Sequence, residues 1–120
     1  MEYDSENIFA KILRGEIPNK TIFEDQYVLA FEDINPQAPI HVLIIPKGPY
    51  SDIVDFGTRA SVEEQAAFAK AIGCVVKIKQ IDKTGFRSIT NTGIDGMQEV
   101  PHYHMHLLGG RSLGPMVNSA

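Results

Sequence analysis

The chain has 120 residues, of which 43% are hydrophobic and 22% charged, and its formal net charge is −4 at pH 7. This length and composition predict one globular domain over residues 1–120 and exclude a collagen, a coiled coil, a disulfide scaffold and a disordered chain. The acidic balance argues against a nucleic-acid-binding protein, which needs a basic surface. One cysteine, an acidic start and the lack of a long hydrophobic run predict a cytoplasmic protein with no secretory signal and no membrane segment.

The N-terminal half predicts one short helix followed by three strands. Ser5 can cap the helix, and hydrophobic residues recur at helical spacing until Gly15, which favours a helix end. Asp25 and Gln26 separate two β-rich runs and predict a hairpin, and a proline-punctuated loop then leads into a strongly β-branched run. The predicted elements are a helix at residues 5–14 and strands at residues 21–24, 27–32 and 40–45.

The C-terminal half predicts a long helix and two further strands. Residues 46–59 are rich in turn formers and are predicted as a connecting stretch. Ser61 begins the long helix, and Glu64 three positions later completes a capping-box pattern. Residues 86–91 and 100–108 predict strands. Short connections between strands favour antiparallel pairing, so the predicted fold class is α+β, with one long and one short helix on a mostly antiparallel five-stranded sheet.

Three of the four histidines, His102, His104 and His106, stand at alternate positions in the last predicted strand. Because successive side chains of a strand point to opposite faces, these three share one face. The hydrophobic residues between them share the other face and can pack under the long helix. Neither a core strand nor an ordinary solvated strand explains a row of three imidazoles well.

Three interpretations of this row remain. The first is a solvated strand face that happens to be rich in histidine. The second is a metal site, because imidazole is the commonest metal ligand and His41, on another predicted strand, can add a ligand. The third is catalysis by histidine itself, in which one neutral imidazole attacks phosphorus and another donates a proton. The spacing alone does not separate metal binding from catalysis.

The motif His102-x-His104-x-His106, with hydrophobic x, resembles the signature of the histidine triad (HIT) family of nucleotide hydrolases and transferases. The resemblance covers nearly the whole chain and is strongest to the Hint branch, the histidine triad nucleotide-binding proteins. It implies the histidine triad fold, a homodimer and a purine nucleotide as substrate, with no metal and no cofactor. The other matching segments are residues 7–12, 16–18, 31–39, 41–47 and 96–110.

The resemblance also implies a role for each histidine. His104 would attack the α-phosphorus of the nucleotide and form a nucleotidyl-histidine intermediate. His106 would contact the phosphate and support the transition state. His102 would set the tautomer and orientation of His104, directly or through the backbone. His41 would join the same network.

For the nucleotide, the resemblance implies that Asp33 accepts hydrogen bonds from the ribose hydroxyls and that the Asn91 amide contacts the phosphate or its neighbours. The side chain of Gln98 and the backbone amides around Glu99 and Val100 would cradle phosphate oxygens. Glu99 stands where many Hint-branch proteins carry a serine or threonine, so either it turns away or the leaving-group preference changes. The hydrophobic residues expected around the purine are Ile8, Phe9, Ile12, Phe31 and Ile34.

The implied activity is hydrolysis of the P–N bond of a purine nucleoside phosphoramidate, as in an adenosine 5'-monophosphoramidase. The products would be a nucleoside monophosphate and an amine. One alternative is a dinucleoside polyphosphate hydrolase or nucleotidyl transferase, in which the same triad chemistry expels another leaving group. The other is a nucleotide-binding regulator whose hydrolysis is incidental.

Overall fold

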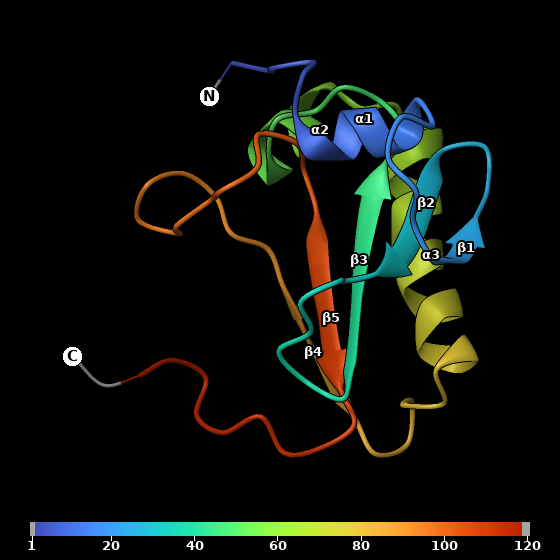
Figure 1. Ribbon diagram of the computed structural model, residues 1–120, viewed down its shortest axis with the longest axis vertical. Coiled ribbons are helices and arrows are strands. Elements are labelled where there is room, and N and C mark those ends of the chain that lie inside the picture. The colour runs from blue at the N-terminus through green and yellow to red at the C-terminus, as the bar shows by residue number, and fades with distance from the viewer. Residues whose placement is uncertain (1, 119–120) are drawn as a thin grey trace.

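One antiparallel sheet forms the centre of the molecule, which the computed structural model describes over residues 2–118 (Figure 1). Within those residues the sheet has five strands in the order β1-β2-β3-β5-β4, and every neighbouring pair is antiparallel. The predicted α+β class and the antiparallel five-stranded sheet are therefore confirmed. The strands are β1 (Thr21–Glu24), β2 (Val28–Glu32), β3 (Ile40–Pro46), β4 (Phe86–Ile89) and β5 (Met105–Gly109).

The central strands β2 and β3 are hydrophobic at consecutive positions because both of their faces are covered. Successive side chains point to opposite faces, so Val42 and Ile44 of β3 lie in one buried cluster. Leu43 and Ile45 lie in a second cluster on the other face. The sheet therefore has a core on each side, which explains why the run at residues 40–45 shows no alternation of hydrophobic and polar residues.

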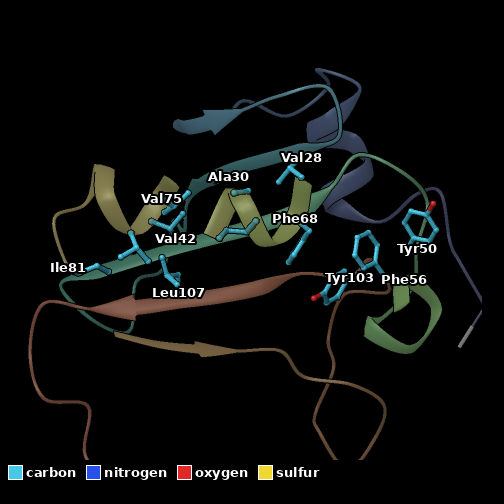
Figure 2. Close-up of a cluster of buried hydrophobic side chains, with 13 residues drawn as sticks. Val28, Ala30, Val42, Tyr50, Phe56, Phe68, Val75, Ile81, Tyr103 and Leu107 are labelled. Carbon is cyan, nitrogen blue, oxygen red and sulfur yellow. The ribbon is translucent and has the colours of Figure 1, made fainter. Parts of the chain in front are cut away.

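Helix α3 (Val62–Ile78) covers the first of these faces, and Figure 2 shows its side chains against β2, β3 and β5. It begins with the predicted capping box: the Ser61 hydroxyl accepts from the Glu64 N–H, and the Glu64 carboxylate accepts from the Ser61 N–H. Tyr103, just before β5, stacks on Phe68 of the helix with ring centroids 4.8 Å apart. The residues between the triad histidines thus pack under the long helix, as the alternation predicted.

A further helix, α2 (Ile53–Arg59), lies in the stretch that the sequence predicted as a connection only. The Asp52 side chain caps it by accepting from the Asp55 N–H, and Phe56 is buried against the ring of Tyr50. Its seven residues are too few to show a hydrophobic period, and helices this short are stabilised mainly by tertiary packing. The prediction of one short helix is therefore corrected to two.

Helix α1 (Ile8–Leu13) packs on the opposite face, where Phe9 contacts side chains of β2 and β3. Its N-cap is Asn7, whose side chain accepts from the Ala10 N–H, rather than Ser5 as predicted. The buried Asn7 amide also donates to the Asp4 carbonyl, so it closes the turn that leads into the helix. Ser5 lies within that turn, two residues before the N-cap, and is exposed.

Strand β5 begins at Met105 rather than at Val100, where the sequence predicted it. Pro101 has no N–H to offer a neighbouring strand. The Tyr103 N–H donates to the Tyr50 carbonyl at 2.7 Å, so it is unavailable to β3. The residues just before β5 therefore have no ladder pairing to the sheet. No helix within residues 2–118 is long and hydrophobic enough to cross a membrane.

Candidate active site

A pocket of about 410 Å³ opens on the sheet face that carries α1, and its volume suits a small-molecule site. Its walls come from α1, the end of β2 and the segment after it, the loop between β4 and β5, and two of the three triad histidines. Among the predicted site residues, those that line it are Ile8, Phe9, Ile12, Phe31, Asp33, Ile34, Asn91, Glu99, Val100, His104 and His106. His41, His102 and Gln98 are not among the lining residues.

His104 has a defined tautomer. Its Nδ1 lies 2.8 Å from the His102 carbonyl oxygen, which can only accept, so Nδ1 carries the proton. Nε2 of the neutral ring therefore keeps a free lone pair. The ring packs edge-on against Phe9, with centroids 4.9 Å apart, and only 7% of the residue is exposed. The one unprotonated nitrogen of a nearly buried imidazole is thus held in the wall of the pocket.

His102 is completely buried and fixed by two partners. Its Nε2 donates to the Pro46 carbonyl at 2.9 Å, so its Nδ1 must act as an acceptor. The Tyr3 hydroxyl donates to that Nδ1 at 2.8 Å. His102 therefore acts on His104 through its backbone carbonyl, while Tyr3 and Pro46 hold its ring.

His41 and His106 form a second fixed pair. The backbone N–H of Gln37 donates to Nδ1 of His41 at 3.0 Å, so Nε2 of His41 carries the proton. That nitrogen lies 2.9 Å from Nδ1 of His106, which must therefore accept. The proton of neutral His106 is then on Nε2, on a residue that lines the pocket. The structure thus offers one nucleophilic nitrogen, on His104, and one N–H donor, on His106.

The surroundings favour the neutral form of all four rings. Burial, together with the smaller effect of neighbouring imidazoles, lowers the pKa of His102 and of His106 to about 4. Burial also lowers the pKa of His104 and of His41, although the Asp33 carboxylate opposes it in both cases. Near pH 7 the lone pair on His104 is therefore not lost to protonation.

Asp33 lines the pocket and lies beside His41. Its Oδ1 accepts from the Asn35 N–H at 2.8 Å, and its Oδ2 lies 3.4 Å from Nε2 of His41. Ile34 lines the same pocket but is 85% exposed, so it forms an edge of the pocket rather than part of the core. Phe9 and Ile12, by contrast, are buried core residues as well as lining residues.

The loop between β4 and β5 is braced by its own side chains. The Asn91 amide donates to the Gly96 carbonyl at 2.7 Å. The Gln98 amide donates to the Ser51 and Val100 carbonyls and accepts from the Gly93 N–H. All the polar atoms of the Gln98 side chain are thus engaged, so it holds the loop in shape rather than facing the pocket as predicted.

Sequence reasoning missed three groups that fix the tautomers: the Tyr3 hydroxyl, the Gln37 N–H and the Pro46 carbonyl. None carries a signal in its own sequence neighbourhood. Two of the three are backbone groups: every residue type offers a carbonyl, and every type except proline offers an N–H. Tyr3 is distant from the triad in the chain and reaches it only through the fold.

The metal interpretation can be tested on the ligand atoms themselves. Asp33, His41 and His106 bring one potential ligand atom each within 4.8 Å of one another. However, Nε2 of His41 carries a proton, because its Nδ1 accepts from the Gln37 N–H. A metal there would have to break that bond and separate two ring nitrogens now 2.9 Å apart. These residues therefore do not fit a metal in their present arrangement.

Comparison with known proteins identifies the family. The family model of the HIT domain matches residues 14–113. A 13.2 kDa HIT-like protein of Azospirillum brasilense is 51% identical over 115 residues, which cover 96% of this chain and 94% of that protein. A purine nucleoside phosphoramidase of Escherichia coli is 47% identical over 115 residues and 93% of each chain. The solved structure of a histidine triad protein from Clostridium difficile matches 98% of this chain and 100% of its own, with a TM-score of 0.86 and 42% identity. The chain belongs to the HIT, or histidine triad, family.

Proposed function

We propose that the protein hydrolyses purine nucleoside phosphoramidates through a nucleotidyl-histidine intermediate on His104. The observation that carries this proposal is the hydrogen bond from Nδ1 of His104 to the His102 carbonyl, which leaves Nε2 unprotonated at a pocket wall. The similarity to the E. coli purine nucleoside phosphoramidase supports the choice of substrate.

In the first step, the lone pair on Nε2 of His104 forms a bond to the α-phosphorus while the P–N bond to the amine breaks. The electron pair of the broken bond stays on the amine nitrogen, which takes a proton from water at the open side of the pocket. The positive charge that develops on the His104 ring is stabilised through its Nδ1–H, which already donates to the His102 carbonyl. Nε2–H of His106 donates to a phosphate oxygen.

In the second step, a water oxygen attacks the same phosphorus and the bond to Nε2 of His104 breaks. The water gives up a proton to solvent, which balances the proton that the amine took up. Nε2 regains its lone pair, and the nucleoside monophosphate leaves. Splitting the displacement in this way replaces one difficult step with two easier ones.

In the proposed complex, each part of the nucleotide lies beside the lining residues that match its polarity. The purine lies among the hydrophobic side chains of α1 and Phe31, and the ribose hydroxyls donate to Asp33. Backbone N–H groups around Val100 and the Asn91 amide lie on the phosphate side. We further propose that the protein is a cytoplasmic homodimer. The strand β4 is at the edge of the sheet with its outer side unpaired within residues 2–118, and a second copy can cover it.

A rapid-quench experiment with adenosine 5'-phosphoramidate tests the activity. We expect steady release of adenosine monophosphate and, at early times, a protein species heavier by one adenylyl group that maps to His104. Preferred cleavage of a dinucleoside polyphosphate would favour the alternative within the family. Tight binding of adenosine monophosphate with no turnover of any phosphoramidate would favour a nucleotide-binding regulator.

A further inference from the structure

The pocket is lined by three carboxylates, those of Glu32, Asp33 and Glu99. No lysine or arginine is among the lining residues in the part of the chain that the structure describes. A polyphosphate leaving group would therefore enter an electronegative space with no fixed cation to receive it. The charge around the pocket thus bears on which leaving group it favours.

Two of the three carboxylates already have partners. Glu32 forms a salt bridge with Lys79 of α3. Asp33 accepts from the Asn35 N–H and lies near the protonated nitrogen of His41. Glu99, in contrast, is exposed, and within residues 2–118 it has neither a hydrogen-bond nor a salt-bridge partner. Its charge is the one left free to act on a substrate.

The position of Glu99 suits contact with the leaving group. The hydrophobic wall for the purine comes from α1 and β2, whereas Glu99 comes from the loop between β4 and β5. With the purine on the α1 side and the phosphorus at His104, the rest of the substrate lies beside this loop. Burial is the main influence that lowers the pKa of His104, and the charge of Glu99 is among those that oppose it, so Glu99 lies within electrostatic reach of the reacting nitrogen.

We propose that Glu99 selects for a cationic leaving group, so that the preferred substrates are purine nucleoside phosphoramidates whose amine carries a second, protonated amino group. This inference rests on the proposed function and specifies its substrate class. Such a substrate brings one negative charge at phosphorus and one positive charge beyond it. The free carboxylate attracts the second charge, while the N–H donors of the pocket bind the first.

The size of the effect follows from the exposure of Glu99. An exposed ion pair changes an equilibrium by roughly two- to fivefold, because water screens it. The charge of Glu99 raises kcat/KM for a cationic amine and lowers it for an anionic one. Removing that charge should therefore change the ratio of the two kcat/KM values by roughly the square of that factor. The preference should weaken as ionic strength rises.

The test uses three adenosine 5'-phosphoramidates with leaving amines of matched length: 1,3-diaminopropane, n-butylamine and 4-aminobutyrate. Their free ends are cationic, neutral and anionic, respectively. The kcat/KM values are measured for the wild-type protein, for Glu99→Gln and for the control Asp95→Asn. Asp95 is an exposed carboxylate of the same loop that does not line the pocket.

We expect the wild-type protein to prefer the diaminopropane substrate over the aminobutyrate substrate, in a ratio that falls about four- to 25-fold in Glu99→Gln. Asp95→Asn should leave the ratio within twofold of the wild-type value, about the precision of such measurements. An unchanged ratio in Glu99→Gln, with all three substrates hydrolysed, would overturn the role of Glu99 and leave the proposed function standing. If the wild-type protein hydrolysed none of the three, the proposed function itself would be wrong, and this inference with it.

Discussion

Tyr3 and His102 are 99 positions apart in the chain, yet the hydroxyl of Tyr3 donates to Nδ1 of His102 at 2.8 Å. Their rings also contact each other, with centroids 5.5 Å apart. Because His102 uses its other nitrogen to donate to the Pro46 carbonyl, the Tyr3 hydroxyl provides the donor that the buried Nδ1 needs. The N-terminal segment thus fixes the residue whose carbonyl orients His104.

Tyr3→Phe should therefore act on the site as a positioning change. A buried acceptor left without its donor costs about 1–3 kcal/mol. We expect a loss of stability of that order, a lower kcat with little change in KM, and a rise in the pKa of His102 above its value of about 4 because the neutral ring loses its partner. Nitrogen-15 NMR of the histidine rings reports both the tautomer and the pKa.

Tyr27→Phe is the matched control for Tyr3→Phe. Tyr27 is also partly buried, and its hydroxyl makes no hydrogen bond within residues 2–118. Tyr27→Phe should leave the nitrogen-15 spectra of the histidine rings and the kcat value unchanged. If Tyr3→Phe behaved in the same way, Tyr3 would have no positioning role.

His104→Ala should abolish turnover and spare binding. Without a nucleophile, kcat should fall by roughly 10³-fold or more. The hydrophobic wall and Asp33 remain, so calorimetry should show binding of adenosine monophosphate within about threefold of the wild-type affinity, a change below 1 kcal/mol. A variant that kept near-normal rates would show that another group attacks the phosphorus.

Removal of metal ions should leave activity intact. The His41 nitrogen nearest to Asp33 and His106 carries a proton, so it has no lone pair for a metal. We expect full phosphoramidate hydrolysis after exhaustive chelation and dialysis. Loss of activity that added zinc restored would show that the hydrogen bond from Gln37 can break and that the three residues can bind a metal.

The buried neutral histidines should make stability depend on pH. Burial lowers the pKa of His102 and of His106 to about 4 in the folded state, while an unfolded chain has a value near 6.5. Between these values the unfolded state binds more protons, so stability is complete above about pH 6.5 and falls as pH drops toward 4. Each of the two rings should lower the free energy of unfolding by roughly 2 kcal/mol at pH 5 relative to pH 7.5.

Urea unfolding at pH 7.5 and pH 5 measures this dependence. His106→Asn should show a smaller difference between the two pH values than the wild-type protein, because one titrating ring is gone. The Asp55–Arg59 pair, whose arginine is exposed, does not contribute in this window, because the pKa of Asp55 is lowered to about 2 and the stabilisation from the pair is lost only below the ordinary carboxyl range. Equal midpoints at both pH values would contradict the assignment of neutral buried rings.

Much of the architecture can be predicted from local patterns. The Ser61–Glu64 capping box marks the start of α3, and the consecutive hydrophobic residues of β3 indicate a strand covered on both faces. The local sequence does not predict α2, because the burial of Phe56, rather than the helix propensity of its residues, stabilises this helix. The start of β5 was misplaced because Tyr103 donates to Tyr50, which lies far away in the chain.

Local pattern is enough to predict which histidines meet in the candidate site: a histidine at every second position predicts a shared face, whatever lies around it, because strand geometry is local. The role of each ring, in contrast, depends on contacts between distant parts of the chain. A tautomer depends on which nitrogen faces a carbonyl and which faces an N–H or O–H. Here those partners come from Tyr3, Gln37 and Pro46, which only the fold brings to the histidines.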